Sequence, residues 1–260
     1  MSTKERKSLL IMDGVSLQGA LRAALAVAPS SGETACVWLQ VIQSEQPSIF
    51  VCANDPKNHM LLAAFVPVVS IDLADERDDC IIVSIPTVRE LLAMKVKKPR
   101  DDELWPNVAW EITEDRITQS DAGVIFGRVF KVKRESPAVY ESVSVPEVLA
   151  ERVAEARDRG FLEYEDWSIA LEPAQVKRIG AAMSNVGVSS ALIECMPPHG
   201  NQSSCTWVRA DDLSILAWTL REEPDATTSA PEADVTVEAN VLELPSARQL
   251  VAANPPKGFA

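Results

Sequence analysis

Residues 48–69 read SIFVCANDPKNHMLLAAFVPVV and predict two β-strands separated by a turn. Apolar and β-branched residues dominate 48–53 and 60–69, which is typical of buried strands. The Asn-Asp-Pro sequence at 54–56 is a combination that favours turns. A further strand-like run at 35–43 comes before them. The turn-rich stretch 44–47 separates it from the run at 48–53, so three strands are expected in succession.

A short amphipathic helix is expected before these strands. Leucines and an alanine recur at spacings of four, four and three residues from Leu17 to Ala28, and Ser16 is a residue type that favours the N-cap position. The Pro-Ser-Ser-Gly sequence that follows is expected to end the helix. The first part of the chain therefore predicts a strand, a helix and then three strands.

This order of elements recurs, which indicates an internal repeat. One such unit cannot cover its own sheet, so neighbouring units are expected to share a core. The second copy is expected as a strand at 80–85, a helix at 86–96 and strands at 107–113, 116–120 and 124–132. The third copy is expected as a strand at 167–171, a helix at 172–186 and strands at 191–196, 205–209 and 214–220. The apolar residues of its helix are Val176, Ile179 and Met183.

The predicted fold class is α+β, built from one full two-unit domain and a further half. An extra helix is expected at 145–160, opened by Pro146 and closed by Gly160. Residues 222–238 hold six acids and no base, which favours a flexible acidic linker. The predicted organisation is a full domain at 1–135, a connector at 136–166, a half-unit at 167–221, and a linker and tail at 222–260.

The charge balance excludes a global attraction to nucleic acid. Lys and Arg number 25 against 38 Asp and Glu, which gives a net charge of −13 and a pI of about 4.7. Any contact with DNA must therefore use a local basic face. No apolar stretch approaches the roughly 20 residues of a membrane span, and no signal-peptide pattern is present, so a cytoplasmic location is expected. The five cysteines, expected to be buried small hydrophobic residues, are Cys36, Cys52, Cys80, Cys195 and Cys205.

The chain carries no recognisable catalytic motif. Its two histidines, His59 and His199, stand in no metal-binding or triad frame, and the common nucleotide-binding and hydrolase motifs are absent from the sequence. We therefore expect no enzymatic activity, no metal and no cofactor. Three carboxylate pairs are interpreted as solvated turns rather than ligands, namely Asp78-Asp79, Asp101-Asp102 and Asp211-Asp212.

Several short segments resemble the bacterial sliding DNA clamp, the beta subunit of DNA polymerase III. The likeness covers residues 9–143 and 167–221, and a phage-encoded form is one origin that it allows. Phe50-Val-Cys-Ala-Asn-Asp55, His59-Met-Leu61 and Val66-Pro67-Val68 resemble the family's Ala-Thr-Asp, His-Arg-Leu and Pro-Ile runs. Ser136-Pro137-Ala-Val-Tyr140-Glu-Ser-Val143 resembles the family's Phe-Pro-x-Tyr-x-x-Val segment. The other similar segments are Ile81-Ile-Val83 with Val88-Arg-Glu-Leu-Leu92, and the strand 216–221.

The resemblance implies a ring that slides on duplex DNA. Its repeat helices would present Lys and Arg to phosphates without reading bases. The residues expected to face DNA are Arg22, Arg89, Lys95, Lys97, Lys98, Lys177 and Arg178, with Arg152, Arg157 and Arg159 as further candidates. The alternative is that these cations are solvated helix faces paired with acids such as Glu90 and Glu155.

The resemblance also implies an apolar pocket in which polymerases and other partners dock a short peptide. Its expected lining residues are His59, Leu61, Pro137, Tyr140, Val143, Leu216 and Trp218. The alternative for the aliphatic members is an ordinary place in the core.

Three functions remain open from the sequence. The favoured one is a processivity factor that binds double-stranded DNA, clamp-binding peptides and a clamp loader as a homo-oligomeric ring; a ring of twelve half-units needs four chains, or three if 145–166 replaces a fourth half. The second is an interaction protein of clamp fold that does not encircle DNA. The third is an enzyme with scattered acidic ligands.

Overall fold

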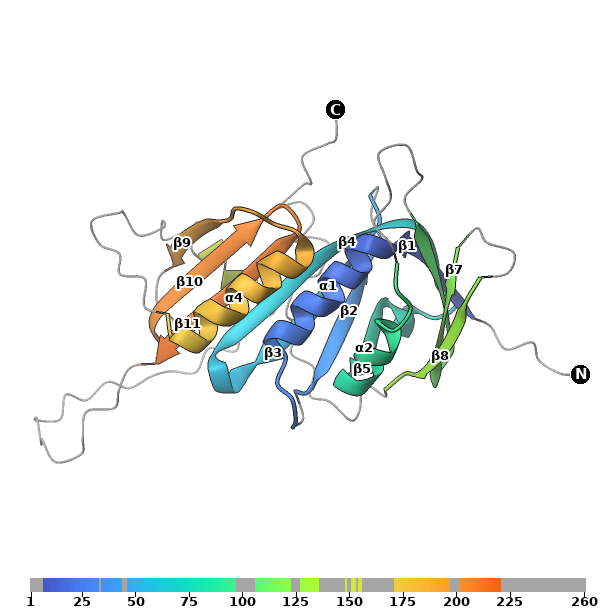
Figure 1. Ribbon diagram of the computed structural model, residues 1–260, viewed down its shortest axis with the longest axis horizontal. Coiled ribbons are helices and arrows are strands. Elements are labelled where there is room, and N and C mark those ends of the chain that lie inside the picture. Colours follow the sequence, from blue (N-terminus) through green and yellow to red (C-terminus); the bar gives the residue numbers. More distant parts are fainter. Residues whose placement is uncertain are drawn as a thin grey trace, which may run out of the picture.

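The computed structural model describes residues 7–32, 34–43, 46–96, 106–122, 127–135, 148, 151–152, 154–155, 171–196 and 202–220 (Figure 1). The fold is α+β, with an antiparallel sheet of eleven strands. The first unit comprises β1 (Ser8–Asp13), α1 (Gly14–Val27), β2 (Cys36–Ile42), β3 (Ser48–Asp55) and β4 (Met60–Asp72). The second unit comprises β5 (Cys80–Ser84), α2 (Ile85–Leu91), β6 (Asn107–Ile112), β7 (Arg116–Asp121) and β8 (Val129–Lys133). The third unit comprises α4 (Pro173–Val186), β9 (Leu192–Met196), β10 (Gln202–Ala210) and β11 (Leu213–Leu220).

The predicted order of helices and strands is confirmed for the described residues, with three differences at helix boundaries and faces. The strand expected at 167–171 lies outside the described residues except for Leu171, which is not in a strand. Helix α1 begins at Gly14 because Asp13, not Ser16, is the N-cap; its carboxylate accepts from the Ser16 amide at 2.6 Å. Helix α2 ends at Leu91 rather than at residue 96. In α4 the buried residues are Gln175, Ile179 and Ala182, while Val176, expected on the apolar stripe, is 54% exposed.

The first two units exchange strands. β1 pairs with β6 of the second unit, and β5 pairs with β2 of the first, both antiparallel. The resulting strand order is β5-β2-β3-β4-β1-β6-β7-β8. Neither unit could cover its sheet alone, so the exchange gives the two units one shared core.

The third unit joins the first through a strand and a helix. β11 pairs with β4 over Leu213–Ala217 and Met60–Ala64, and α4 packs against α1. The helices approach closely at Gly19, where a Cβ atom would lie 2.9 Å from the carbonyl oxygen of Asn185. A side chain at this position would therefore push α1 and α4 apart.

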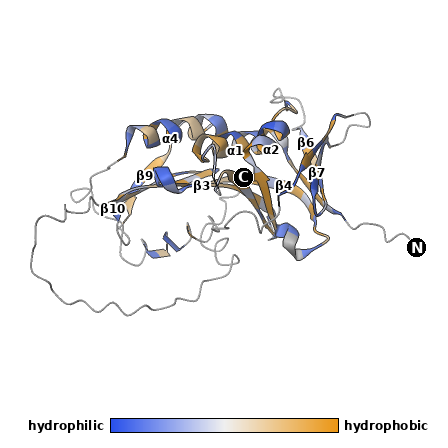
Figure 2. Ribbon diagram, turned by 90° about the horizontal axis from the view of Figure 1, so that it is seen from below, coloured by the Kyte–Doolittle hydropathy of each residue, from blue (hydrophilic) through white to orange (hydrophobic). Residues whose placement is uncertain are grey.

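The sheet has two apolar faces. The helices α1, α2 and α4 all lie on one side of it, as Figure 2 shows, and cover the larger core that includes Leu10, Leu39 and Trp110. The Trp110 indole donates to Gln119 at 2.8 Å, so this buried polar group is satisfied. The opposite face holds a second cluster that includes Trp38, Leu61 and Leu216.

One carboxylate expected in a solvated turn is instead buried. Asp78 accepts from the Ser8 hydroxyl at 2.6 Å and pairs with Arg134, whose side chain is 6% exposed. Because Arg134 also donates to the Thr113 carbonyl at 3.2 Å, the network joins both units. The expectation is confirmed for Asp211-Asp212, which form the exposed turn between β10 and β11, while Asp101-Asp102 lie outside the described residues.

The cysteines are free thiols, and all except the half-buried Cys80 are buried, as expected from their apolar surroundings. Burial raises the pKa of the Cys36 thiol to about 11, so this group stays neutral at physiological pH. None of the helices among the described residues has the length and apolar character that a membrane crossing requires.

Candidate functional site

Four of the cations expected to face DNA are exposed on the helix-covered side of the sheet. Arg22 lies on α1, Arg89 on α2, Lys95 just after α2 and Lys177 on α4. The three helices share one face of the sheet (Figures 1 and 2), so these cations belong to one surface, the helix layer. Lys97 and Lys98 lie outside the described residues.

The position of Arg22 is set by a chain of hydrogen bonds. Arg22 is the one exposed residue of α1, and its guanidinium donates to the Gln18 side chain at 2.9 Å. Gln18 is 5% exposed and its amide donates to the Met94 carbonyl, which links α1 to the segment after α2. The buried Gln18 side chain therefore fixes the position of the Arg22 guanidinium at the surface.

These four cations are not neutralised within the described part of the chain, where none of them pairs with a carboxylate. Glu90, a partner that the solvated-face interpretation suggested, does not pair with Arg89. Helices α1 and α4 contain no acidic residue between their first and last positions. In a chain of net charge −13, this helix layer is locally basic.

Arg178 does not fit the expectation that it faces DNA. Its guanidinium pairs with Asp55, whose side chain is 1% exposed, and donates to the Val27 carbonyl at 3.0 Å. Val27 is the last residue of α1, where carbonyl groups lack partners within the helix. Arg178 therefore fastens α4 to the first unit. The buried face of α4 is rotated about the helix axis relative to the predicted apolar face. For this reason the sequence predicted that Arg178 would face solvent.

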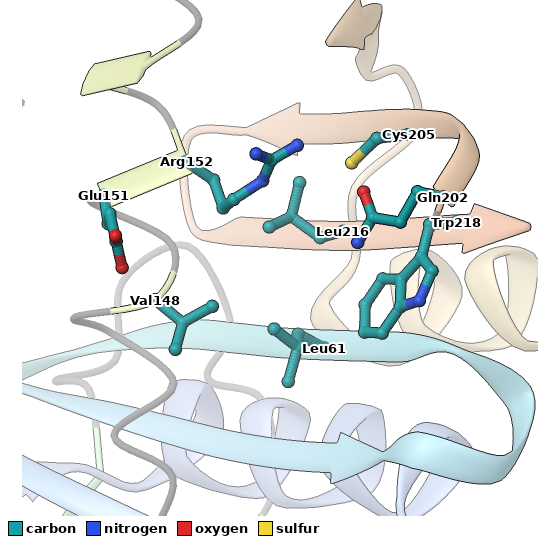
Figure 3. Close-up of a pocket in the computed structure, with 8 residues that line it drawn as sticks. All are labelled: Leu61, Val148, Glu151, Arg152, Gln202, Cys205, Leu216 and Trp218. Carbon is teal, nitrogen blue, oxygen red and sulfur yellow. The ribbon is translucent and has the colours of Figure 1, made fainter. Parts of the chain in front are cut away.

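The pocket residues gather on the opposite face of the sheet (Figure 3). Leu61 from β4, and Leu216 and Trp218 from β11, line one pocket of about 210 Å³. Leu61 and Leu216 are 5% and 2% exposed, so they belong both to the core and to the pocket, while Trp218 is half-buried. The remaining lining residues are Val148, Glu151, Arg152, Gln202 and Cys205.

His59 contacts Trp218 rather than the pocket itself. The two ring centroids lie 5.9 Å apart, and His59 adopts a left-handed backbone conformation with φ 51° at the end of the turn between β3 and β4. Its carbonyl accepts from the Trp218 amide at 3.1 Å. Pro137, Tyr140 and Val143 lie outside the described residues.

A buried glutamine fixes the backbone at Trp218. The Gln175 amide is fully buried and donates to the carbonyls of Trp218 and Asn58 at 3.0 and 2.9 Å. Helix α4 thus positions, through the sheet, a residue that lines the pocket on the other side. The sequence shows no sign of this, since a helical Gln is ordinarily solvated.

The pocket wall contributed by Val148 and Arg152 was missed at the sequence level. Both are helical, in agreement with the extra helix expected at 145–160. Arg152, a further candidate for DNA contact, is instead 8% exposed and pairs with Glu155 on the face away from the helix layer. Arg157 and Arg159 lie outside the described residues. The apolar Val148 within a helical stretch was the available signal.

The pocket combines apolar walls with one buried cation. Burial raises the pKa of the Cys205 thiol, and a hydrogen bond with Arg152 opposes that rise. Because Arg152 is already paired with Glu155 and Glu151 also lines the pocket, the arrangement suits an apolar anchor side chain. Among the described residues no group of His, Cys, Asp and Glu is placed to hold a metal ion.

No protein-family model and no curated protein matches the sequence. Solved structures match over most of the chain. The beta subunit of DNA polymerase III from Thermotoga maritima has a TM-score of 0.54 and 14% identity, over 86% of this chain and 68% of that one. A Helicobacter pylori beta clamp bound to a DNA ligase peptide has a TM-score of 0.51 and 10% identity, over 86% and 70%. The Pseudomonas aeruginosa beta subunit has a TM-score of 0.50 and 10% identity, over 86% and 68%. The chain thus shares its fold with bacterial sliding clamps.

Proposed function

We propose that the protein is a sliding-clamp-like processivity factor that encircles duplex DNA and docks partner peptides in the pocket opposite the helix layer. The observation that carries the proposal is the gathering of Arg22, Arg89, Lys95 and Lys177 on one helix-covered face of an acidic chain. Cations on helices meet phosphates without reading bases, so binding would be independent of DNA sequence and weakened by salt. The role is binding rather than catalysis.

Retention on circular DNA tests this function. The dilute full-length chain is concentrated in the presence of nicked circular plasmid, so that rings assemble around the duplex, and the complex is separated by gel filtration in moderate salt. We expect co-elution with the circle and release after a restriction enzyme linearises it, because a topological link survives salt but has an exit at a free end. Equal release from both forms would contradict encirclement.

The other candidate function is partner binding without encirclement. The pocket supports it, since the pocket is present whether or not a ring closes. A chain that binds partner peptides but shows no topological retention would have this function instead.

Replacing Trp218 with alanine is expected to weaken peptide binding about 30-fold, the effect of losing a hot-spot contact of about 2 kcal/mol. Trp218 lines the pocket through its half-buried ring, while its backbone contacts remain in the variant. The measurement is fluorescence anisotropy with a labelled peptide that carries Leu and aromatic anchors. Val69→Ala, at a residue 62% exposed, is the control. Unchanged affinity in the Trp218 variant would remove the pocket assignment.

A further inference from the structure

The ladder between β4 and β11 ends one residue before the aromatic side chain of the pocket. Its last pair is Met60 with Ala217. One bond continues beyond that pair, in which the Trp218 amide donates to the His59 carbonyl at 3.1 Å. Before Met60 the chain leaves the strand direction, because the backbone of His59 is left-handed, with φ 51°. The carbonyls of Trp218 and Asn58 therefore lie past the regular ladder, where a donor must come from another element.

Helix α4 supplies the donors for both carbonyls through one side chain. The Gln175 amide nitrogen donates to the Asn58 carbonyl at 2.9 Å and to the Trp218 carbonyl at 3.0 Å. The Gln175 side-chain oxygen accepts from the Glu172 amide at 2.9 Å, which fixes the side chain to the start of its own helix. Gln175 is 0% exposed. Among neutral side chains, only those of Asn and Gln donate twice from one nitrogen and also accept, so the residue type suits this position.

The two backbone segments joined by Gln175 carry the aromatic part of the docking surface. Trp218 lines the pocket, as Figure 3 shows, and its indole lies 5.9 Å from the imidazole of His59, the residue after Asn58. Both aromatic side chains are half-buried, so core packing surrounds them only in part. A side chain that is already in its bound orientation loses less conformational entropy when a partner docks. The hydrogen bonds of Gln175 therefore bear on affinity.

We infer that Gln175 is a positioning residue for peptide docking, which keeps the His59–Trp218 aromatic pair in the orientation that receives the anchor side chain of a partner. Gln175 is fully buried and does not itself line the pocket, so its effect on a partner passes through Trp218. The inference rests on the proposed peptide docking and deepens it, because it places a determinant of affinity on α4, in the helix layer.

Replacing Gln175 with methionine keeps the length of the side chain but removes both donors. We expect the labelled peptide with Leu and aromatic anchors to bind about 10-fold more weakly, the effect of having to order one interfacial side chain on binding. In a Trp218→Ala background the same replacement should have no further effect, because the indole that Gln175 positions is absent. Equal effects in the two backgrounds would overturn the inference. Gln175→Asn, whose amide is one methylene group too short to reach both carbonyls, should reproduce the loss and replaces the methionine variant if that variant does not fold.

A second buried glutamine, Gln119, provides the matched control. It is 2% exposed, donates to the Leu91 carbonyl at 3.1 Å and accepts from the Trp110 indole at 2.8 Å. Gln119→Met also removes the hydrogen bonds of a buried amide and so lowers stability, but it does so in the second unit. We expect it to leave peptide affinity unchanged. If it weakens binding as much as Gln175→Met does, the effect reflects lost stability and the inference is wrong.

A measurement without peptide separates this inference from the proposed function. In nitrogen-15 NMR spectra of the full-length chain, the indole signal of Trp218 is the one that is absent from Trp218→Ala. We expect Gln175→Met to shift and broaden this signal, because the indole no longer keeps its place against His59, and Gln119→Met to change the Trp110 signal instead. If the wild-type chain binds no peptide but the shift is observed, the docking function fails while Gln175 is still shown to position the aromatic pair. An unchanged Trp218 signal in Gln175→Met would overturn the inference.

Discussion

Replacing Arg178 with alanine is expected to lower the free energy of unfolding by about 3 kcal/mol, the usual cost of breaking a buried ion pair from one side. The Asp55 carboxylate, 1% exposed, would be left buried without the guanidinium that compensates it. The Val27 carbonyl at the end of α1 would also lose its donor. Urea denaturation followed by circular dichroism measures the change.

The neighbouring cation provides a matched control. Lys177 is exposed and forms no ion pair with a described residue, so Lys177→Ala is expected to change stability by less than about 0.5 kcal/mol. Combining Arg178→Ala with Asp55→Asn should cost less than the sum of the two single changes, because both remove one interaction. Equal, small effects at 177 and 178 would show that Arg178 does not fasten α4 to the first unit.

Replacing the four exposed cations of the helix layer with alanine is expected to reduce the salt dependence of DNA binding sharply. Each phosphate contact contributes about 0.9 to the slope of log Kobs against log salt concentration, so four contacts contribute about 3.6. Affinity at low salt should fall at least 100-fold. The measurement is anisotropy of a labelled duplex across a KCl series, with the variant carrying alanine at Arg22, Arg89, Lys95 and Lys177.

A second quadruple variant separates the surface from the net charge. Alanine at Lys7, Arg116, Lys131 and Lys133 removes four cations beside β1 and on β7 and β8, and either set changes the net charge from −13 to −17. The control variant should keep most of the affinity and slope. If both variants lose binding equally, the helix layer is not the DNA-facing surface.

Local sequence patterns were sufficient for the order of elements. Hydrophobic periodicity and turn residues located the hairpin of β3 and β4. The repeated order of helix and strands along the sequence indicated three units. The pocket members Leu61, Leu216 and Trp218 were identified through their resemblance to clamp segments, and they do line one pocket. The strand exchange between β1, β6, β2 and β5 was not predicted, because pairing partners far apart in sequence leave no periodic signal.

The sequence established the α+β class, the repeated unit and the cations that stand on helices, since these depend on spacing within about a dozen residues. It could not separate Arg178 from Lys177, or recognise that Arg152 lies at the pocket and away from the helix layer. Successive residues of a helix point about 100° apart, but which direction is interior depends on the element that packs there. For α4 that element is the first unit, more than a hundred residues away along the chain. Burial, and with it the role of each charge, is therefore a property of the assembled fold.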